Sequence, residues 1–466
     1  MKNYGILDIG KTHVKFQLID GNYETCFSAH RHNEILKDGL YPHIDVDGIW
    51  SWFLVQLKKV SLKYHISSIN VSTHGATAAL VSTTSSCHSG LILPIMDYEW
   101  SGINCDEEYS NIRPSFYETY SPLLPKGMNL GRQLFWLQKN YPNEFYLSQT
   151  ILLYPQYWVW RMTDRSISEI TSLGCHSDLW NPKENKYSSL ALSMGWIKKF
   201  PPLHLATMPV GYISQKFIME SGVNNDCIVY SGLHDSNASY LRYMNHQGIV
   251  NNTVISTGTW TVCFSPDTPI EKLSEKHDML INVDIHNKPV PCARFMGGRE
   301  FGTICQQLNV SPNTKVYEQD ISEIIARNVM AFPDFSGGIG GPFVGKKNKI
   351  VGVTDKGAAL AALYVALMID YELDLLGSSN DIVIEGAFAK NTLICRILAQ
   401  LRPEVSISVS SDTTGTISGA ASLCMSEYYK NEKSEKLVDK EVCFPTELGK
   451  LEEYSHLWRN LINKTS

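Results

Sequence analysis

The feature that most constrains the fold is a pair of alternating apolar and polar runs joined by a glycine, and it occurs twice. In residues 5–20 an apolar run reaches Asp8 and Gly10, and alternation then resumes. A period of two predicts two strands, and the glycine at their junction predicts a tight tip. Residues 250–264 have the same layout, with Gly258 at the tip. Two such hairpins opening the two halves of one chain indicate an internal duplication.

The first tip carries side chains suited to a phosphate and magnesium site. Gly10 can adopt backbone angles closed to other residues, so neighbouring N–H groups can converge on one anion. Lys11, Thr12 and Lys15 add cationic and hydroxyl donors beside it. Asp8 supplies the carboxylate oxygens that a hard divalent cation prefers. The alternative interpretation is an edge hairpin with a solvated Asp8, and this motif alone leaves both open.

The same stretch matches the spacing of a P-loop, because Gly5 is followed by four residues and then by Gly10, Lys11 and Thr12. A P-loop needs an open loop before this triplet and a helix after it. Here the four spacer residues continue a strand, and the residues after Thr12 alternate like another strand. The pattern therefore disfavours a P-loop.

The length and the net charge limit the class of protein to which this chain can belong. A chain of 466 residues is longer than one hydrophobic core usually serves, so we expect two or three domains. A polar run at Asn245 divides it into residues 1–244 and 245–466. The net charge of −6 disfavours nucleic acid or an anionic membrane as the main partner. The longest apolar run, residues 358–369, is too short to span a bilayer and predicts a buried helix.

The cysteines indicate a reducing compartment. All eleven are scattered, without a Cys-x-x-Cys pair, which disfavours a disulfide framework and a zinc site. Residues 1–4 lead into the first strand without the apolar segment of a signal peptide. We therefore expect a cytoplasmic protein with reduced thiols. The oligomeric state stays open, with a homodimer as one option.

Polar side chains follow further predicted strands. The strand at residues 66–73 ends in His74 and Gly75, and a short apolar strand leads to Asp97 and Glu99. Open α/β sheets bind ligands beyond the carboxyl ends of their strands. These four residues are therefore candidate ligand contacts, with loop capping as the alternative for each.

A third strand end carries a histidine and a carboxylate. Residues 227–237 run from an apolar strand through a glycine to His234 and Asp235. An aspartate in such a loop is well placed to take a proton from a hydroxyl group. The alternative is that Asp235 caps the helix predicted from Ser236 onward.

Four stretches, taken in order, resemble the FGGY carbohydrate kinases of the sugar-kinase, actin and Hsp70 superfamily, and two of them, those that contain His234-Asp235-Ser236 and residues 256–260, are most similar to the rhamnulose- and fuculose-kinase branch. The four stretches are Asp8-x-Gly10-Lys11-Thr12-x-x-Lys15, Gly232-x-His234-Asp235, Ser256-Thr257-Gly258-Thr259-Trp260 and Gly386-Ala387-x-Ala389-Lys390-Asn391. The resemblance implies an α/β fold of two ribonuclease-H-like domains facing a central cleft. Residues 1–244 would bind a small-molecule sugar, and residues 245–466 would bind ATP.

The resemblance also implies a role for each candidate residue. Asp235 would be the catalytic base that deprotonates a sugar hydroxyl as it attacks the γ-phosphorus of ATP. Asp8 would position Mg²⁺, and the N–H groups of Gly10 and Gly258 would offset phosphoryl charge. The expected nucleotide contacts are Gly10, Lys11, Thr12, Lys15, Gly258, Thr259, Gly298, Gly386, Ala387 and Asn391. The expected sugar contacts are His74, Gly75, Asp97, Glu99, His234 and Ser236.

Two departures from the family's pattern limit this assignment. Many members have an unbroken glycine run near the adenine, whereas residues 385–388 read Glu-Gly-Ala-Phe, which leaves the adenine contacts open and makes Phe388 a candidate stacking face. Residues 97–100 read Asp-Tyr-Glu-Trp rather than the family's aromatic, Asp and Arg arrangement. The expected substrate is therefore only a small ketose, deoxyketose or polyol.

Two other functions compete with a kinase. A non-catalytic ATP-dependent switch or binding protein of the same superfamily is the main alternative, and the pair His234-Asp235 favours the enzyme over it. A serine hydrolase is disfavoured, since there is no Gly-x-Ser-x-Gly motif and no evident serine nucleophile beside that pair.

Overall fold

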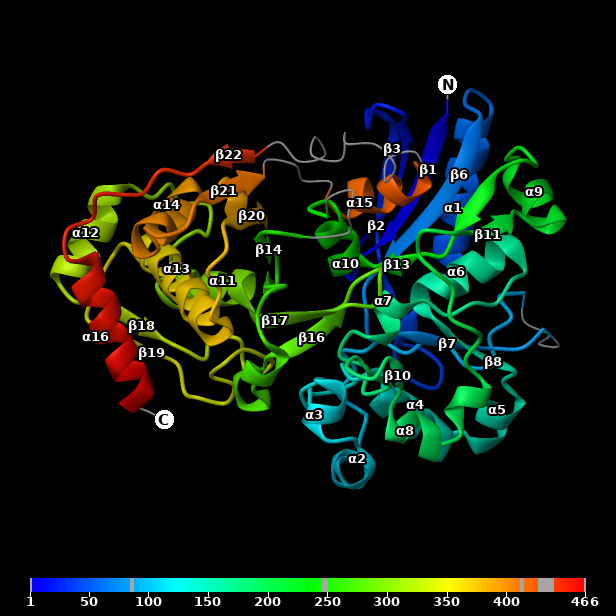
Figure 1. Ribbon diagram of the computed structural model, residues 1–466, viewed down its shortest axis with the longest axis horizontal. Coiled ribbons are helices and arrows are strands. Elements are labelled where there is room, and N and C mark those ends of the chain that lie inside the picture. The colour runs from blue at the N-terminus through cyan, green and yellow to red at the C-terminus, as the bar shows by residue number, and fades with distance from the viewer. Residues whose placement is uncertain (1, 84–87, 245–249, 411–414, 426–439, 465–466) are drawn as a thin grey trace. The chain divides into compact units, whose positions relative to one another are not determined.

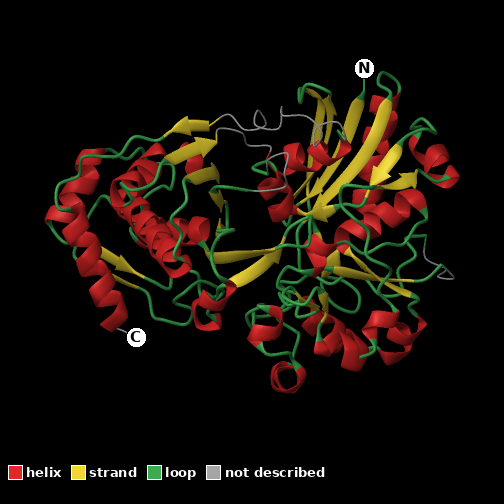
Figure 2. Ribbon diagram, in the orientation of Figure 1, coloured by secondary structure: helices red, strands yellow, loops and turns green. Residues whose placement is uncertain are grey.

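The computed structural model describes residues 2–83, 88–244, 250–410, 415–425 and 440–464. It divides into two compact units, each with a central sheet (Figures 1 and 2). Unit 1 consists of Met1–Gly248, Ile281–Pro289 and Thr414–Glu435. Unit 2 consists of Ile249–Leu280, Val290–Thr413 and Lys436–Ser466. Unit 1 is therefore built mostly from the first half of the chain and completed by two short segments of the second half.

The central sheet of unit 1 contains the first predicted hairpin. Its order is β11-β12-β6-β1-β2-β3, and β13 also pairs with β6. The strands are β1 (Asn3–Ile9), β2 (His13–Asp20), β3 (Thr25–His32), β6 (Ile66–Thr73), β11 (Pro209–Tyr212), β12 (Ile228–Tyr230) and β13 (Leu233–His234). β1 and β2 are antiparallel, whereas β6 is parallel to both β1 and β12. Because a strand follows the tip, the P-loop interpretation is excluded.

The sheet of unit 2 repeats this layout. It contains the run β17-β15-β14-β20-β21-β22. These strands are β14 (Thr253–Thr257), β15 (Thr261–Phe264), β17 (Pro289–Phe295), β20 (Ile382–Gly386), β21 (Ile407–Ser410) and β22 (Lys440–Val442). The hairpin β14–β15 is antiparallel, and β20 is parallel to β14 and to β21. The run β3-β2-β1-β6-β12 therefore corresponds strand for strand to β17-β15-β14-β20-β21, as the predicted duplication requires.

Helices and short strand pairs complete unit 1. The helices are α1 (Val46–Ser61), α2 (Asp106–Ile112), α3 (Phe116–Thr119), α4 (Leu130–Asn140), α5 (Pro142–Leu147), α6 (Tyr154–Thr163), α7 (Ile170–Leu173), α8 (Ser189–Ser193), η1 (Trp196–Lys198), α9 (Gln215–Ser221), α10 (Asp235–Leu241) and α15 (Gly415–Cys424). The strand pairs are β4 (Ile35–Leu36) with β5 (His43–Ile44), β7 (Ala78–Val81) with β8 (Thr150–Leu153), and β9 (Trp180–Asn181) with β10 (Lys186–Tyr187).

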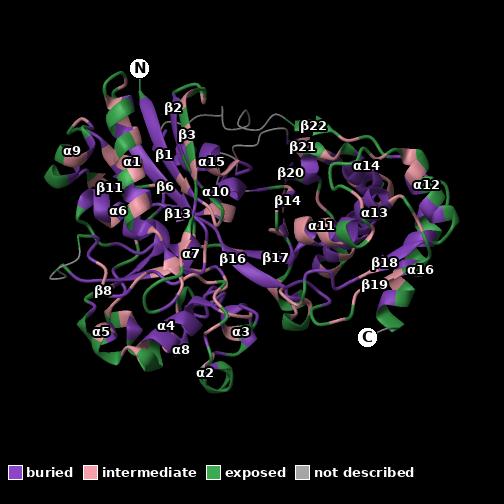
Figure 3. Ribbon diagram, turned by 180° about the vertical axis from the view of Figure 1, so that it is seen from behind, coloured by how far each residue is buried: buried purple, intermediate pink, exposed green. Residues whose placement is uncertain are grey.

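The core of unit 1 lies between this sheet and the helices. α1 begins after Asp45, whose side chain accepts a hydrogen bond from the N–H of Gly48, and its apolar face buries Trp50, Phe53 and Leu57. The buried strands β1 and β6 stand out in Figure 3. α15, although far away in sequence, contacts α10, β1 and β6 (Figure 1). The C-terminal segment is therefore part of this core.

Unit 2 is organised around α13 (Gly357–Leu376), a 20-residue helix that is buried along most of its length, as residues 358–369 predicted. It contacts α11, α12 and α14. The other elements are η2 (Ile270–Lys272), η3 (Glu275–His277), α11 (Gly297–Gln307), α12 (Glu318–Ala326), η4 (Phe388–Lys390), α14 (Thr392–Leu401), α16 (Leu451–Lys464), and the pair β18 (Met330–Phe332) and β19 (Lys349–Val351). β16 (Leu280–Val283) lies where the chain passes into the Ile281–Pro289 segment of unit 1.

One expected strand is missing. A short apolar strand was predicted before Asp97, but residues 91–96 form only isolated bridges, between Leu91 and Val81 and between Met96 and His43. The N–H of Asp97 donates to the carbonyl of Pro42. The residues before Asp97 are apolar because they are buried, but they have no continuous strand partner, so their pattern wrongly indicated a strand.

Candidate functional site

The register of three parallel strands places most of the predicted catalytic and sugar residues at one edge of the unit 1 sheet. Asp8 of β1 pairs with Ser72 of β6, and His234 of β13 pairs with Thr73. The strands therefore end at the same level, where His74 follows β6 and Asp235 follows β13. This is the carboxyl edge at which α/β sheets bind ligands.

Asp8 is half-buried and lies opposite Lys15 on the antiparallel neighbour strand. Burial and the nearby Asp235 carboxylate raise the pKa of Asp8 to about 7, while Lys15 acts in the opposite direction. Two carboxyl groups thus lie within electrostatic reach of each other. A divalent cation beside Asp8 would offset their repulsion, so this donor set fits the Mg²⁺ that was expected there.

The carboxylate of Asp235 is held through one of its two oxygens. Oδ1 accepts from the N–H of Ser236 at 2.6 Å and from its hydroxyl at 3.3 Å, and lies 3.2 Å from Nε2 of His234. No hydrogen bond from the described residues reaches Oδ2. About 32% of the side chain is exposed. Oδ2 is therefore the oxygen available to a ligand.

His74 forms an aromatic wall beside this carboxylate. Its ring centroid lies 5.0 Å from that of Tyr154 and 5.3 Å from that of Tyr98. Burial lowers the pKa of His74 to about 4, so the ring is neutral. The neighbouring Gly75 has no room for a side chain, because an added Cβ would lie 2.8 Å from Nε2 of His234. The backbone here passes directly against the imidazole.

The loop with Asp97 and Glu99 contacts the first hairpin. Lys11 forms an ion pair with Asp97, and its Nζ lies 3.9 Å from Oε2 of Glu99 and 4.7 Å from the ring centroid of Tyr98. Lys11, expected among the nucleotide contacts, is therefore turned toward the expected sugar loop. Thr12 and Lys15 are exposed.

The two glycine tips differ from expectation in one respect. The N–H of Gly10 donates to the carbonyl of His13 at 2.9 Å, and that of Gly258 donates to the carbonyl of Trp260 at 2.8 Å. Each closes its own turn, so neither N–H group is available to a phosphate. The expectation that these two donors offset phosphoryl charge is wrong in this structure.

In unit 2 the predicted small residues surround the tip of the second hairpin. A Cβ on Gly298 would lie 2.2 Å from the carbonyl oxygen of Gly258, and one on Gly386 would lie 1.9 Å from that of Thr257. The N–H of Ala387 donates to the same Thr257 carbonyl. Only glycines permit this approach, so the backbone segments pack directly against one another around the hairpin tip.

The remaining predicted residues of unit 2 lie beside these backbone segments. Thr259 is exposed at the hairpin tip, and Asn391 precedes α14. Phe388 is buried at 6% exposure, with its ring centroid 6.0 Å from that of Phe301. The ring of Phe388 is therefore not exposed for stacking on an adenine, because it packs in the core.

Residues that the sequence interpretation passed over adjoin His234. The thiol of Cys175 contacts His176 and His234. The N–H of His234 donates to the hydroxyl of Thr171 at 3.0 Å, and its Nδ1 lies 3.1 Å from Oδ1 of Asn237. Residues 170–178 showed no periodicity, so only the presence of Cys175 and His176 could have singled them out.

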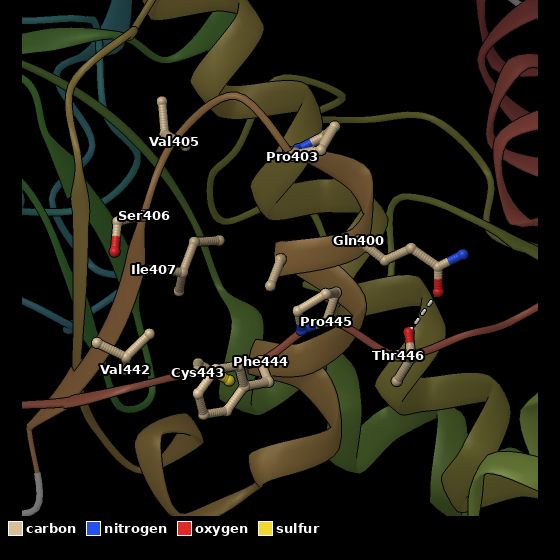
Figure 4. Close-up of a pocket in the computed structure, with 11 residues that line it drawn as sticks. Gln400, Pro403, Val405, Ser406, Ile407, Val442, Cys443, Phe444, Pro445 and Thr446 are labelled. Atoms are coloured by element: carbon tan, nitrogen blue, oxygen red, sulfur yellow. Dashed lines mark hydrogen bonds between the residues drawn. The ribbon is translucent and has the colours of Figure 1, made fainter.

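Cavities elsewhere do not coincide with these residues. One of about 340 Å³ in unit 2 lies between α14 and the strand β22, where Gln400 accepts from the hydroxyl of Thr446 (Figure 4). Another, of about 240 Å³ in unit 1, lies near Asp45 and Leu93. Neither is lined by a predicted site residue. Within the described ranges, no group of three or more His, Cys, Asp or Glu could hold a metal ion, and no helix is long and apolar enough to cross a membrane.

Solved structures share this fold. A carbohydrate kinase from Novosphingobium aromaticivorans is 32% identical, with a TM-score of 0.85, over 98% of this chain and 100% of that one. A xylulose kinase from Lactobacillus acidophilus, 16% identical, has a TM-score of 0.81 over 100% of this chain and 98% of that one. The predicted α/β fold of two ribonuclease-H-like domains is thereby confirmed.

Sequence comparisons give the family. A probable L-xylulose kinase from Haemophilus influenzae is 26% identical over 278 residues, 56% of this chain and 55% of that protein. The chain thus spans about half the length of the curated relatives it matches. The model described as "FGGY family of carbohydrate kinases, N-terminal domain" matches residues 3–241, and that described as "Carbohydrate kinase FGGY, C-terminal domain" matches residues 250–434. Because these matches include nearly all of the described residues, the chain belongs to the FGGY family of carbohydrate kinases.

Proposed function

We propose that this protein transfers the γ-phosphoryl group of ATP to a hydroxyl of a small ketose, deoxyketose or polyol, with Asp235 as the general base. One observation carries the proposal. Asp235 is fixed through Oδ1 at the carboxyl edge of the unit 1 sheet, which leaves Oδ2 to accept a proton. As the sugar oxygen forms its bond to phosphorus, the hydroxyl proton passes to Oδ2, and ADP leaves with the electrons of the broken P–O bond.

The sugar side of the site favours an uncharged polyhydroxylated chain. Asp97 and Glu99 together carry one more negative charge than Lys11 balances, and Asp235 adds another. These carboxylates accept hydrogen bonds from hydroxyl groups but repel an acid sugar. Neutral His74 can also bond a hydroxyl. The names of the xylulose kinase relatives make pentuloses the first class to test.

The nucleotide side is assigned to the backbone surface around Gly258, Gly298 and Gly386, with Thr259, Ala387 and Asn391 beside it. Kinases of this family use ATP, generally with Mg²⁺. Bound Mg²⁺ would neutralise charge on the transferring phosphoryl group, and Asp8 would hold it. Lys15 and Thr12 are exposed at the first tip and able to meet phosphate oxygens. We place this activity in the cytoplasm, where ATP and reduced thiols coexist.

The test is an ADP-release assay with Mg-ATP over pentuloses, deoxyhexuloses, tetruloses, polyols and aldonates. We expect sugar-dependent ADP formation with a neutral sugar and none with aldonates. Asp235→Asn should lower kcat by at least about a thousandfold while sugar binding, measured by calorimetry, persists. Asp38→Asn, at an exposed position, is the matched control. Nucleotide-driven structural change without phosphorylation of any sugar would instead identify an ATP-dependent switch.

A further inference from the structure

The orientation of the Asn237 side chain defines the proton on one nitrogen of His234. Nδ2 of Asn237 lies 2.5 Å from the carbonyl oxygen of Val283, an atom that can only accept. The amide nitrogen must face it, so Oδ1 faces His234. Oδ1 lies 3.1 Å from Nδ1 of His234 and also only accepts. Nδ1 therefore carries a hydrogen.

The other ring nitrogen faces a second acceptor. Nε2 of His234 lies 3.2 Å from Oδ1 of Asp235, which already accepts two hydrogen bonds from Ser236. A neutral ring protonated on Nδ1 would set the lone pair of Nε2 against those of a carboxylate. Protonation of Nε2 replaces this repulsion with an ion pair.

We propose that His234 is an imidazolium cation at neutral pH and that Asn237 is the positioning residue that keeps it so. The backbone supports the same placement, because the His234 N–H is fixed by the hydroxyl of Thr171. The ring itself is buried, at 5% exposure, so the cation is screened from water. In this proposal His234 pairs with the carboxylate of Asp235, whereas the sequence pattern predicted that it would contact the sugar.

The charged and titratable groups around the ring support this state on balance. Burial alone would lower the pKa of His234, but Cys175 and Asp235 raise it to about 10. Buried Glu169 also acts on His234 electrostatically, and it accepts a hydrogen bond from the hydroxyl of Thr171. His74, which also interacts electrostatically with His234, is neutral.

The thiol of Cys175 is the group that competes for the same proton. It contacts His234 and also His176, whose ring centroid is 6.5 Å from that of His234. A thiol donating to Nε2 would leave the imidazole neutral, whereas a thiolate would leave it charged. The two alternatives differ only in where one proton resides, so a direct measurement can decide between them.

A fixed cation at this place has a consequence for the reaction, which rests on the proposed role of Asp235. It occupies Oδ1, so the proton taken from the sugar goes to Oδ2. Because both ring hydrogens are already committed, His234 does not take up that proton. The pH dependence of kcat should therefore show no titration of His234 between about pH 6 and 8.

The test is nitrogen NMR of ¹⁵N-histidine-labelled protein, with His234→Gln identifying the signal among the 14 histidines. We expect both ring nitrogens of His234 to stay protonated from about pH 6 to 8.5. This readout needs no turnover, so it separates the inference from the proposed kinase activity. A neutral ring at pH 7.5 in the wild-type protein would overturn the proposal.

Asn237 is tested with two variants. Asn237→Asp keeps an acceptor for Nδ1, although it loses the donor to the Val283 carbonyl, and should preserve the imidazolium signal of His234. Asn237→Leu removes the acceptor and should lower the pKa of His234 by at least about 2, so that the ring loses a proton within the measured pH range, and should lower kcat by about tenfold. Unchanged signals from the other histidines report intact folding. An Asn237→Leu protein with an unaltered His234 signal would remove Asn237 from this role.

Discussion

Lys11 at the tip of the first hairpin forms an ion pair with Asp97, 86 residues further along the chain. The side chains are only 25% and 12% exposed, so the pair is screened less than a typical surface ion pair. The Tyr98 ring and the Glu99 carboxylate also lie close to the ammonium group of Lys11. Lys11 therefore orders the loop assigned to the sugar, although the sequence pattern places it among phosphate contacts.

Replacing this lysine should affect sugar binding rather than nucleotide binding. In Lys11→Met the loop loses its cation and Asp97 and Glu99 repel each other, so we expect KM for the sugar to rise by about tenfold. KM for ATP should change by less than about twofold. Steady-state kinetics with each substrate varied in turn checks this, with exposed Lys37→Met as the control. A rise confined to the KM for ATP would instead identify Lys11 as a contact of the ATP phosphates.

The glycines of α11 offer a matched pair at the proposed nucleotide surface. A Cβ on Gly298 would lie 2.2 Å from the Gly258 carbonyl, whereas one on Gly302, one turn later, meets nothing within 4 Å. Gly298→Ala should therefore displace the hairpin tip and raise KM for ATP by about tenfold or more. Gly302→Ala should leave it unchanged and slightly stabilise the helix. If both variants have the same KM for ATP, the tip of the second hairpin does not take part in nucleotide binding.

Local periodicity predicted much of the fold correctly. The strand expected at residues 66–73 is β6 (Ile66–Thr73), and the buried helix expected at 358–369 lies within α13 (Gly357–Leu376). Both segments have a strong apolar pattern that their tertiary neighbours reinforce. The segment before Asp97 shows where this fails, because its apolar residues are buried in a loop with isolated bridges.

The site was predictable where strand register determines it. Asp8, His74 and Asp235 end parallel strands, and parallel strands in register bring their carboxyl ends together. Which atoms are already used within the turns could not be read from residue type, as the N–H groups of Gly10 and Gly258 show. The surroundings of His234 were likewise invisible, because Thr171 reaches its N–H, and Val283 reaches the amide of Asn237, only through the tertiary fold.

Asp8 should control the requirement for divalent cations. Asp8→Asn keeps the size of the side chain but removes the charge that would hold Mg²⁺, so the half-saturating Mg²⁺ concentration should rise by about tenfold or more. Chelation of Mg²⁺ should stop turnover of the wild-type protein, and its re-addition should restore it. Titrations of Mg²⁺ at fixed ATP, with Asp38→Asn as the control, check this. An unchanged Mg²⁺ requirement would exclude Asp8 as the metal ligand.

A buried glutamate of unit 2 should make stability depend on pH. Glu300 of α11 is 2% exposed and accepts a hydrogen bond from the hydroxyl of Tyr364. Burial, with a smaller contribution from the nearby Asp334, raises its pKa from 4.5 to about 8. Between these values the folded protein holds a proton that the unfolded chain releases, so this group's contribution to stability falls as pH rises from 4.5 to about 8.

Glu300→Gln removes this titration and keeps the acceptor for Tyr364. Relative to wild type, the variant should gain stability at pH 8 and show little gain at pH 5, because the protonated glutamate and the amide are both neutral. A tenfold difference in proton affinity between the folded and unfolded protein corresponds to about 1.4 kcal/mol, so the gain at pH 8 should be a few kcal/mol at most. Urea unfolding midpoints at the two pH values check this, with exposed Glu404→Gln as the control. If the difference between variant and wild type does not change with pH, Glu300 is ionised in the folded protein and is stabilised by a partner other than Tyr364.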